Sequence, residues 1–262
     1  SLKSAYLADA ENLFNFFRFL SGLPDVSIGN METMYAQKAV VLLAAVDTLT
    51  HYPGRPDDMA NDFFYDDGYR GTSSSNLGMG RQKLTDGLGD MMQDRGENNE
   101  KSVGHRRWTL SPRMKSVGFG QAQRLHIFLS VYVMDSRANF TDYQTICWPS
   151  GPAFPANFFP PGTVWSVSLN PEKYNTSAAD LQGAHVTLTD HTRGEVSEFF
   201  SGCGKHFYIN NGNYGVNNAI IFRPDYAIYP ADGHYTVVIT GLSPKGDNPA
   251  TIQYSVRFFS LP

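Results

Sequence analysis

The chain has 262 residues, of which 41% are hydrophobic and 18% charged, a composition typical of a globular protein with one large domain or two ordinary ones. Its net charge of -4 and its pI of about 5.9 provide no basic field that would attract nucleic acid, so no nucleic-acid partner is expected. No apolar run approaches the ~20 residues of a membrane-spanning helix, so no transmembrane segment is expected either.

Two helices are predicted in the first fifty residues. Residues 4–20 place apolar side chains at alternating spacings of four and three, which is the stripe of an amphipathic helix. Charged residues interrupt the same stretch (Asp9, Glu11 and Arg18), unlike a signal peptide, so an exported form is expected to have lost its signal already. A second helix is predicted over 32–49, and it leaves His51 just beyond its end because Pro53 disfavours continuation.

A loop, a helix and a β-hairpin are predicted next. Residues 54–80 are rich in Asp, Gly and Ser and are interpreted as a loop, whereas residues 82–93 return to helical spacing. Strands are predicted over about 116–121 and 125–134, and the second strand is apolar on both faces. Such a strand is covered on both sides, so helices are expected on both faces of this sheet.

The composition changes near Cys147. Residues 148–162 contain five prolines interleaved with Trp148, Phe154, Phe158 and Phe159, which indicates a packed connector rather than a free linker. Seven short β-like runs follow, separated by Gly, Asn, Asp and Pro, and this spacing is typical of a β-sandwich. The runs cover residues 164–170, 185–190, 195–200, 206–210, 218–224, 234–241 and 252–259.

The segment 94–120, DRGENNEKSVGHRRWTLSPRMKSVGFG, carries the main candidate for a functional residue. Gly104 directly before His105 removes side-chain bulk, so the imidazole can sit in a pocket or at an edge without crowding. Two arginines follow it. Taken alone, a histidine beside two arginines is also what a surface position or a hydrogen-bonded structural position looks like.

The order of these pieces resembles the CAP superfamily, the cysteine-rich secretory, antigen-five and pathogenesis-related-one proteins. The likeness covers roughly residues 4–135. It rests on Asn12–Arg18 in the first helix, Ala36-Gln37 with Ala39, His51, the helix that closes at Asp94, and Gly104-His105. The Gly-His-Arg-Arg-Trp and Gly-Phe-Gly wording is similar to the bacterial branch, some members of which carry a second β-domain.

The resemblance implies an α+β protein, secreted or held at the cell surface. It implies a CAP-type α-β-α sandwich over 1–145, followed by an all-β sandwich over 146–262 that includes the connector 148–162. It also implies a cleft in which His51 and His105 face each other beside an acid at Asp94, and the two histidines of the family can hold a divalent metal such as zinc. No other cofactor is expected.

One position departs from the family. The usual Gly-Glu-Asn is here Ser74-Ser75-Asn76, so Ser75 stands in the cleft where a glutamate is expected. Two imidazoles, a carboxylate and a water would form a catalytic type of zinc site, but Asp94 could instead orient an imidazole from behind. Without the glutamate the site has one negative charge fewer, so weak metal affinity is expected.

Two functions fit what the resemblance implies. The first is binding, with a lipid, a cell-wall fragment or a protein as the ligand of the cleft. The alternative is a hydrolase, a peptidase or an esterase with or without a metal, that uses the same His51, Asp94 and His105. The absence of a carboxylate at Ser75 removes a general-base candidate and favours binding.

Other chemistries have weaker support in the sequence. Ser73–Ser75 lack the Gly-x-Ser-x-Gly of a nucleophile elbow. The acidic run over 57–67 lacks the EF-hand spacing and is interpreted as a solvated loop. The remaining histidines are scattered, and isolated histidines are more often structural or exposed than ligands. Cys147 and Cys203 form no CxxC pair; a bridge between them is conceivable if the protein meets an oxidant, and the sequence leaves this open.

Overall fold

The computed structural model describes residues 4–132, 140–225 and 229–261, which form a mixed α and β protein. Contacts group the chain into two compact units, the first made of Ser1–Phe19, Leu23–Met92 and Ser111–Asn139, the second of Leu20–Gly22, Gln93–Leu110 and Phe140–Pro262. The boundary predicted between residues 145 and 146 stays a prediction, but the contacts assign Gln93–Leu110, with Asp94 and His105, to the second unit. Within the described ranges, no helix is both long and apolar enough to cross a membrane.

The helices of the first unit are α1 (Ser4–Leu20), α2 (Asn30–Val46), a π-helix η1 (Phe63–Gly68), α3 (Tyr69–Ser73) and α4 (Leu84–Gln93). The prediction of a loop over 54–80 is wrong for its second part, which contains η1, α3 and a strand. Aromatic packing explains the difference, because Phe64 is buried and contacts the rings of Tyr65 and Tyr69. Two of the acidic side chains there stabilise this structure: Asp62 caps η1, and Asp67 pairs with Lys38.

Four strands form the sheet of the first unit in the order β1-β3-β4-β2. Their bounds are β1 Ser27–Ile28, β3 Ser116–Gln123, β4 Ile127–Tyr132 and β2 Ser75–Met79. β1 pairs parallel with β3, while β3 with β4 and β4 with β2 are antiparallel. Residues 133 and 134 of the predicted second strand lie outside the described residues.

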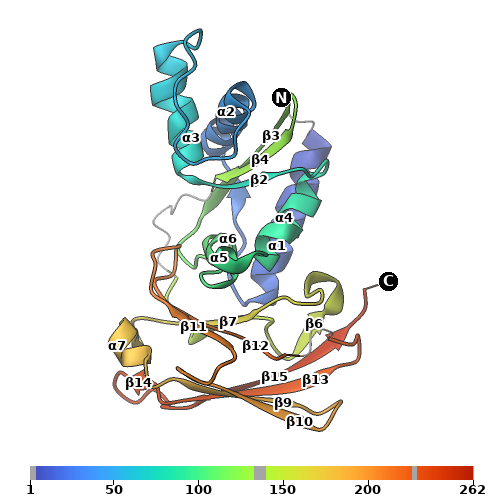
Figure 1. Ribbon diagram of the computed structural model, residues 1–262, viewed down its shortest axis with the longest axis vertical. Helices are drawn as coiled ribbons and strands as arrows, with labels where there is room; N and C mark the ends of the chain where they lie inside the picture. The colour runs from blue at the N-terminus through green and yellow to red at the C-terminus, as the bar shows by residue number, and fades with distance from the viewer. Residues whose placement is uncertain (1–3, 133–139, 226–228, 262) are drawn as a thin grey trace. The chain divides into compact units, whose positions relative to one another are not determined.

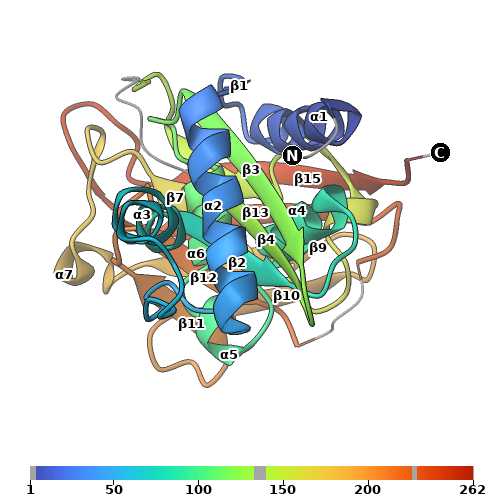
Figure 2. The ribbon, with the colours of Figure 1, turned by 90° about the horizontal axis from the view of Figure 1, so that it is seen from above.

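The Gly-Phe-Gly of β3 explains how helices cover both faces of this sheet. A Cβ atom on Gly118 or Gly120 would lie 2.0–2.2 Å from backbone atoms of α2, so both glycines let α2 rest directly on the strand. Phe119 points the other way and meets Phe14 of α1, with ring centroids 5.9 Å apart. On that second face α4 also approaches, because Gly87 lies against Leu129 of β4. Figure 2 shows α2 lying along β3 and β4.

The second unit contains two main sheets (Figure 1). One has the order β10-β9-β13-β15-β6, with bounds Glu195–Phe199, His185–Asp190, His234–Thr240, Ile252–Phe259 and Ala153–Pro155. The other has the order β11-β12-β7-β5, with bounds His206–Asn210, Ala219–Arg223, Trp165–Leu169 and Thr145–Trp148. Each of the seven predicted β-like runs therefore forms a strand.

Smaller elements complete the second unit. They are α5 (Glu97–Glu100), α6 (Gly104–Thr109), a 3-10 helix η2 (Ala156–Phe158), α7 (Ala178–Leu181) and the strand pair β8 (Tyr174–Asn175) with β14 (Ser243–Pro244). The segment GHRRWT, which precedes β3 in the chain, is thus a short helix and not part of the hairpin. The hairpin belongs to the first unit, whereas α6 belongs to the second.

Aromatic side chains fill the space between the two main sheets. Trp165 of β7 contacts Tyr235 of β13 and Phe258 of β15, with centroids 5.7 and 6.3 Å apart. The proline-rich connector joins this core, because Trp148 and Phe154 are fully buried and meet edge to face at 4.7 Å. Burying a large apolar side chain is worth about 1.5–3 kcal/mol, so these rings hold the two sheets together.

The two cysteines are free thiols, and the bridge that the sequence left open does not form. Cys147 is buried in β5 with its sulfur 3.4 Å from Oγ1 of Thr145, whereas Cys203 is half-buried in the turn after β10. Both thiols belong to the second unit, and they differ in burial.

Candidate functional site

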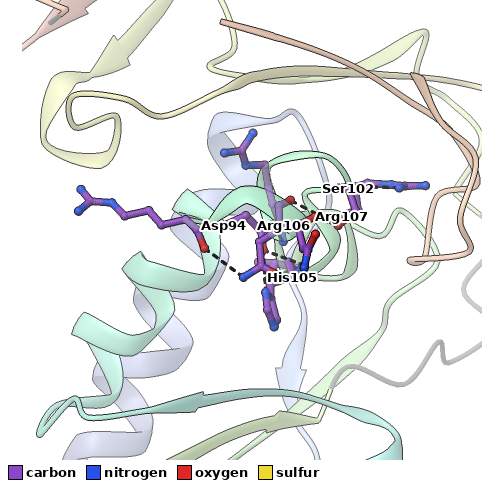
Figure 3. Close-up of polar contacts among 9 residues, drawn as sticks. Asp94, Ser102, His105, Arg106 and Arg107 are labelled. Atoms are coloured by element: carbon purple, nitrogen blue, oxygen red, sulfur yellow. Dashed lines mark hydrogen bonds and ion pairs between the residues drawn. The ribbon is translucent and has the colours of Figure 1, made fainter. Parts of the chain in front are cut away.

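Asp94 is the centre of the best-defined polar group in the protein. It follows the last residue of α4 and has a φ of 48°, in the left-handed region that a non-glycine residue adopts at a cost. Its side chain has no exposed surface. One carboxylate oxygen accepts from Nδ1 of His105 at 2.6 Å, and the other accepts from the backbone N–H of Arg106 at 2.9 Å. Figure 3 shows these contacts around the short helix α6.

The carboxylate caps the first turn of α6. Helix N-termini present unsatisfied N–H groups and a partial positive charge, both of which favour an anion. The residue before the helix, Val103, has a φ of 44°, which is an outlier for a β-branched side chain. Strain of this kind costs of order 1–3 kcal/mol and persists where the surroundings fix the backbone. The turn is therefore held in place for His105 by contacts that outweigh this strain.

Asp94 positions His105 and favours its protonated form. Its side chain is 25% exposed. Burial lowers the pKa of the imidazole, but the hydrogen bond and the negative charge of Asp94 raise it by more, so the pKa lies above its ordinary value. Because the buried carboxylate accepts at Nδ1, that nitrogen carries a proton, and the ring orientation is fixed.

The two arginines of the motif are buried and structural. The Arg106 side chain reaches the carbonyl of Val164 and the hydroxyl of Ser166, both at 2.9 Å. Arg107 donates to Asn210 Oδ1 at 2.8 Å and to the Val216 carbonyl at 3.1 Å. Burial lowers the pKa of each guanidinium to about 10, which still leaves both cations charged at neutral pH. These contacts bind α6 to the β-rich part of the second unit.

Gly104 has a structural role that the sequence did not predict. A Cβ atom there would lie 3.0 Å from the ring of Tyr214, so the glycine allows α6 to approach this ring closely. The same ring lies 5.0 Å from the guanidinium of Arg107 in a cation–π contact. The sequence contained no indication that Tyr214, more than one hundred residues away, belongs to this motif.

The geometry decides between the two roles considered for Asp94. Both oxygens accept protein N–H groups, and the carboxylate is inaccessible to solvent, so it orients the imidazole and is not placed to ligate an ion itself. Across the described ranges, His, Cys, Asp and Glu form no group of three or more that could hold a metal.

The other predicted cleft residues lie in the first unit. His51 follows α2 and is exposed, with Nδ1 2.9 Å from the carbonyl oxygen of Thr72. Ser75 and Asn76 open β2 and are buried; Ser75 lies opposite Tyr132 of β4. The Ser75 hydroxyl has no hydrogen-bond partner among the described residues. The structure thus brings Asp94 to His105 within the second unit, and His51 to Thr72 of α3, the helix that precedes β2, within the first unit.

Neither the family models nor the curated proteins include a match to this chain. The likeness to the CAP superfamily therefore rests on the motif residues themselves, and the site is interpreted from its own geometry. That geometry is a histidine fixed by a buried aspartate, beside two buried arginines.

Proposed function

We propose that this protein is a secreted, CAP-like bacterial protein that acts by binding a ligand through His105. The observation that supports the proposal most directly is the 2.6 Å hydrogen bond from His105 to the buried Asp94, which fixes the ring and favours its cationic form. The ligand is a lipid, a cell-wall fragment or a protein. The family likeness, rather than this geometry, adds His51, Ser75 and Asn76 to the same cleft within a CAP-type α-β-α sandwich, followed by a β-sandwich.

The local charges favour an anionic group on that ligand. Arg106 and Arg107 are cations, and Asp94 is the carboxylate whose charge acts on both of them. Two cations and one carboxylate leave one positive charge before His105 is protonated and two afterwards. In a poorly hydrated environment this excess attracts a carboxylate or phosphate and disfavours a divalent cation. The metal-dependent form of the function is therefore the weaker one.

The hydrolase alternative draws on the same pair. A carboxylate that orients a histidine is the arrangement by which a general base is held in hydrolases. However, a raised pKa keeps more of the imidazole protonated at neutral pH and so less of it available as a base. Ser75 also leaves the cleft of the family without its second carboxylate. Binding is the function that these charges support better.

A pH-resolved binding experiment tests the proposal. Vesicles that carry phosphatidylglycerol and a soluble muropeptide carboxylate serve as anionic probes, and phosphatidylcholine vesicles serve as the neutral control. The wild type is expected to bind an anionic probe more tightly at pH 6 than at pH 8, because protonation adds a positive charge to His105. His105→Gln keeps a donor for Asp94 but cannot be protonated, so its binding should not change with pH. Equal pH dependence in both proteins, or equal binding of neutral probes, would overturn the proposal.

A further inference from the structure

The second unit contains a cavity whose lining does not include Asp94 or His105. Its volume is about 440 Å³, which is within the range of small-molecule sites. Its walls come from residues 20–22, from β5 and the turn after it, and from β15. The side chains that give it its chemistry are those of Ser21, Thr145, Cys147, Ser150, Tyr254 and Ser255.

The wall of this cavity is neutral. Its lining contains no Asp, Glu, Lys, Arg or His. The two groups that could ionise are held in their protonated forms: burial raises the pKa of the Cys147 thiol to about 11, and burial also raises the pKa of the Tyr254 hydroxyl well above its ordinary value. The wall supplies no opposite charge to a charged ligand, so whatever hydration such a ligand loses here is not compensated. The cavity therefore favours neutral ligands over ions.

The wall also offers unused hydrogen-bonding capacity. Among the described residues, the buried Tyr254 hydroxyl meets only the Cys147 thiol, which is a weak partner. Thr145 Oγ1 accepts from the Cys147 sulfur at 3.4 Å, so its own proton can be donated elsewhere. Ser21 and Ser150 donate to the backbone carbonyls of Cys147 and Leu20, which leaves their oxygen atoms able to accept. Burying polar groups without partners is unfavourable, and a ligand with several hydroxyls would satisfy them.

We propose that this cavity binds a neutral, hydroxyl-rich small molecule, a monosaccharide unit without ionised groups. The hydroxyls of the wall exchange donors and acceptors with those of the sugar, and the Tyr254 ring provides an apolar surface for its C–H face. The site is independent of the one proposed around His105. It uses other residues and selects neutral rather than anionic groups.

Cys147 serves as a reporter that is built into the cavity. In a Cys203→Ser variant it is the remaining thiol, and its rate of modification by methyl methanethiosulfonate at pH 8.5 is measured with and without sugar. Glucose and N-acetylglucosamine are the neutral probes; glucose 6-phosphate and glucuronate, which are both anionic at pH 8.5, are the matched controls. At a neutral sugar concentration ten times its Kd, the rate should fall about tenfold by mass action. Absence of protection by any neutral sugar, or equal protection by the charged ones, would overturn the proposal.

Two variants separate this site from the proposed function. Tyr254→Phe removes one hydroxyl, and the loss of one hydrogen bond corresponds to an affinity decrease of about 2- to 12-fold. Tyr208→Phe removes a hydroxyl in β11, away from the cavity, and should leave sugar binding unchanged. His105→Gln should likewise retain protection by neutral sugars, even if the anion-binding proposal fails. Unchanged affinity in Tyr254→Phe, or a loss as large in Tyr208→Phe, would contradict the assignment of this wall.

Discussion

Replacing Asp94 by asparagine tests whether the buried carboxylate organises the site. The side chain keeps its size but loses its charge, and one of its two acceptor atoms becomes a donor that faces an N–H group of His105 or Arg106. Hydrogen bonds to a charged acceptor are worth about 1.5–3 kcal/mol, against about 0.5–1.5 kcal/mol for neutral ones. The substitution weakens the hydrogen bonds from His105 and Arg106, and it removes the negative charge that acts on two buried arginines. We expect it to lower the free energy of unfolding by about 3–5 kcal/mol, as when a buried ion pair loses one partner.

The loss should depend on pH, with a sign that the His105 pKa determines. Asp94 raises the folded-state pKa of His105 above the unfolded value of ~6.5, so this stabilisation is fully present below pH ~6.5 and disappears as the pH rises through the folded-state pKa. The difference between wild type and Asp94→Asn should therefore be larger at pH 5.5 than at pH 8.5. At pH 8.5 the contribution of the Arg106 N–H and of the two guanidinium groups remains.

Urea unfolding at the two pH values measures both effects. Asp90→Asn is the matched control, because Asp90 forms an exposed ion pair with Arg81, of a kind that contributes about 0–1 kcal/mol. The reasoning is refuted if Asp94→Asn is no more destabilised than Asp90→Asn, or if its loss is larger at pH 8.5 than at pH 5.5. The first outcome would mean that the carboxylate does not hold α6; the second would mean that it does not raise the pKa of His105.

Three further predictions concern the motif and its chemistry. Arg106→Met should destabilise the protein by about 3 kcal/mol, because the Val164 carbonyl and the Ser166 hydroxyl lose their donor; a thermal melt that stays within 1 °C of wild type would contradict this. Zinc titration calorimetry at pH 7.5 should show weak binding that His105→Ala reduces further, whereas equal affinity in both proteins would remove His105 from any metal site. A panel of peptides and esters should show no turnover above background, with or without zinc; activity that His51→Ala/His105→Ala abolishes would instead establish the hydrolase.

Periodicity was sufficient to predict the three longest helices and the longer strands. The four-three spacing of residues 4–20 and the seven β-like runs after residue 163 correspond to α1 and to the main strands of the second unit. The stretch 63–79 was missed because its helices are short and their stability comes from the packing of Phe64 and Tyr69, which composition does not show. The pairing of β6 with β15 was equally invisible, since a parallel partner about one hundred residues away leaves no local pattern.

Prediction of the site was limited in the same way, because contacts between distant side chains leave no local pattern in the sequence. The sequence singled out Asp94 and His105, and in the structure Nδ1 of His105 lies 2.6 Å from Oδ1 of Asp94. The sequence did not indicate that the two arginines next to His105 are buried, because a charged residue is ordinarily exposed. These two arginines are exceptions because residues between 164 and 216 supply their hydrogen-bond partners. Because consecutive residues of a helix point in different directions, one motif supplies both the partly exposed imidazole and the buried cations that fix it. The charge that favours an anionic ligand at His105 is therefore the charge that holds α6 in the fold, so a substitution at Arg106 should weaken anion binding and stability together.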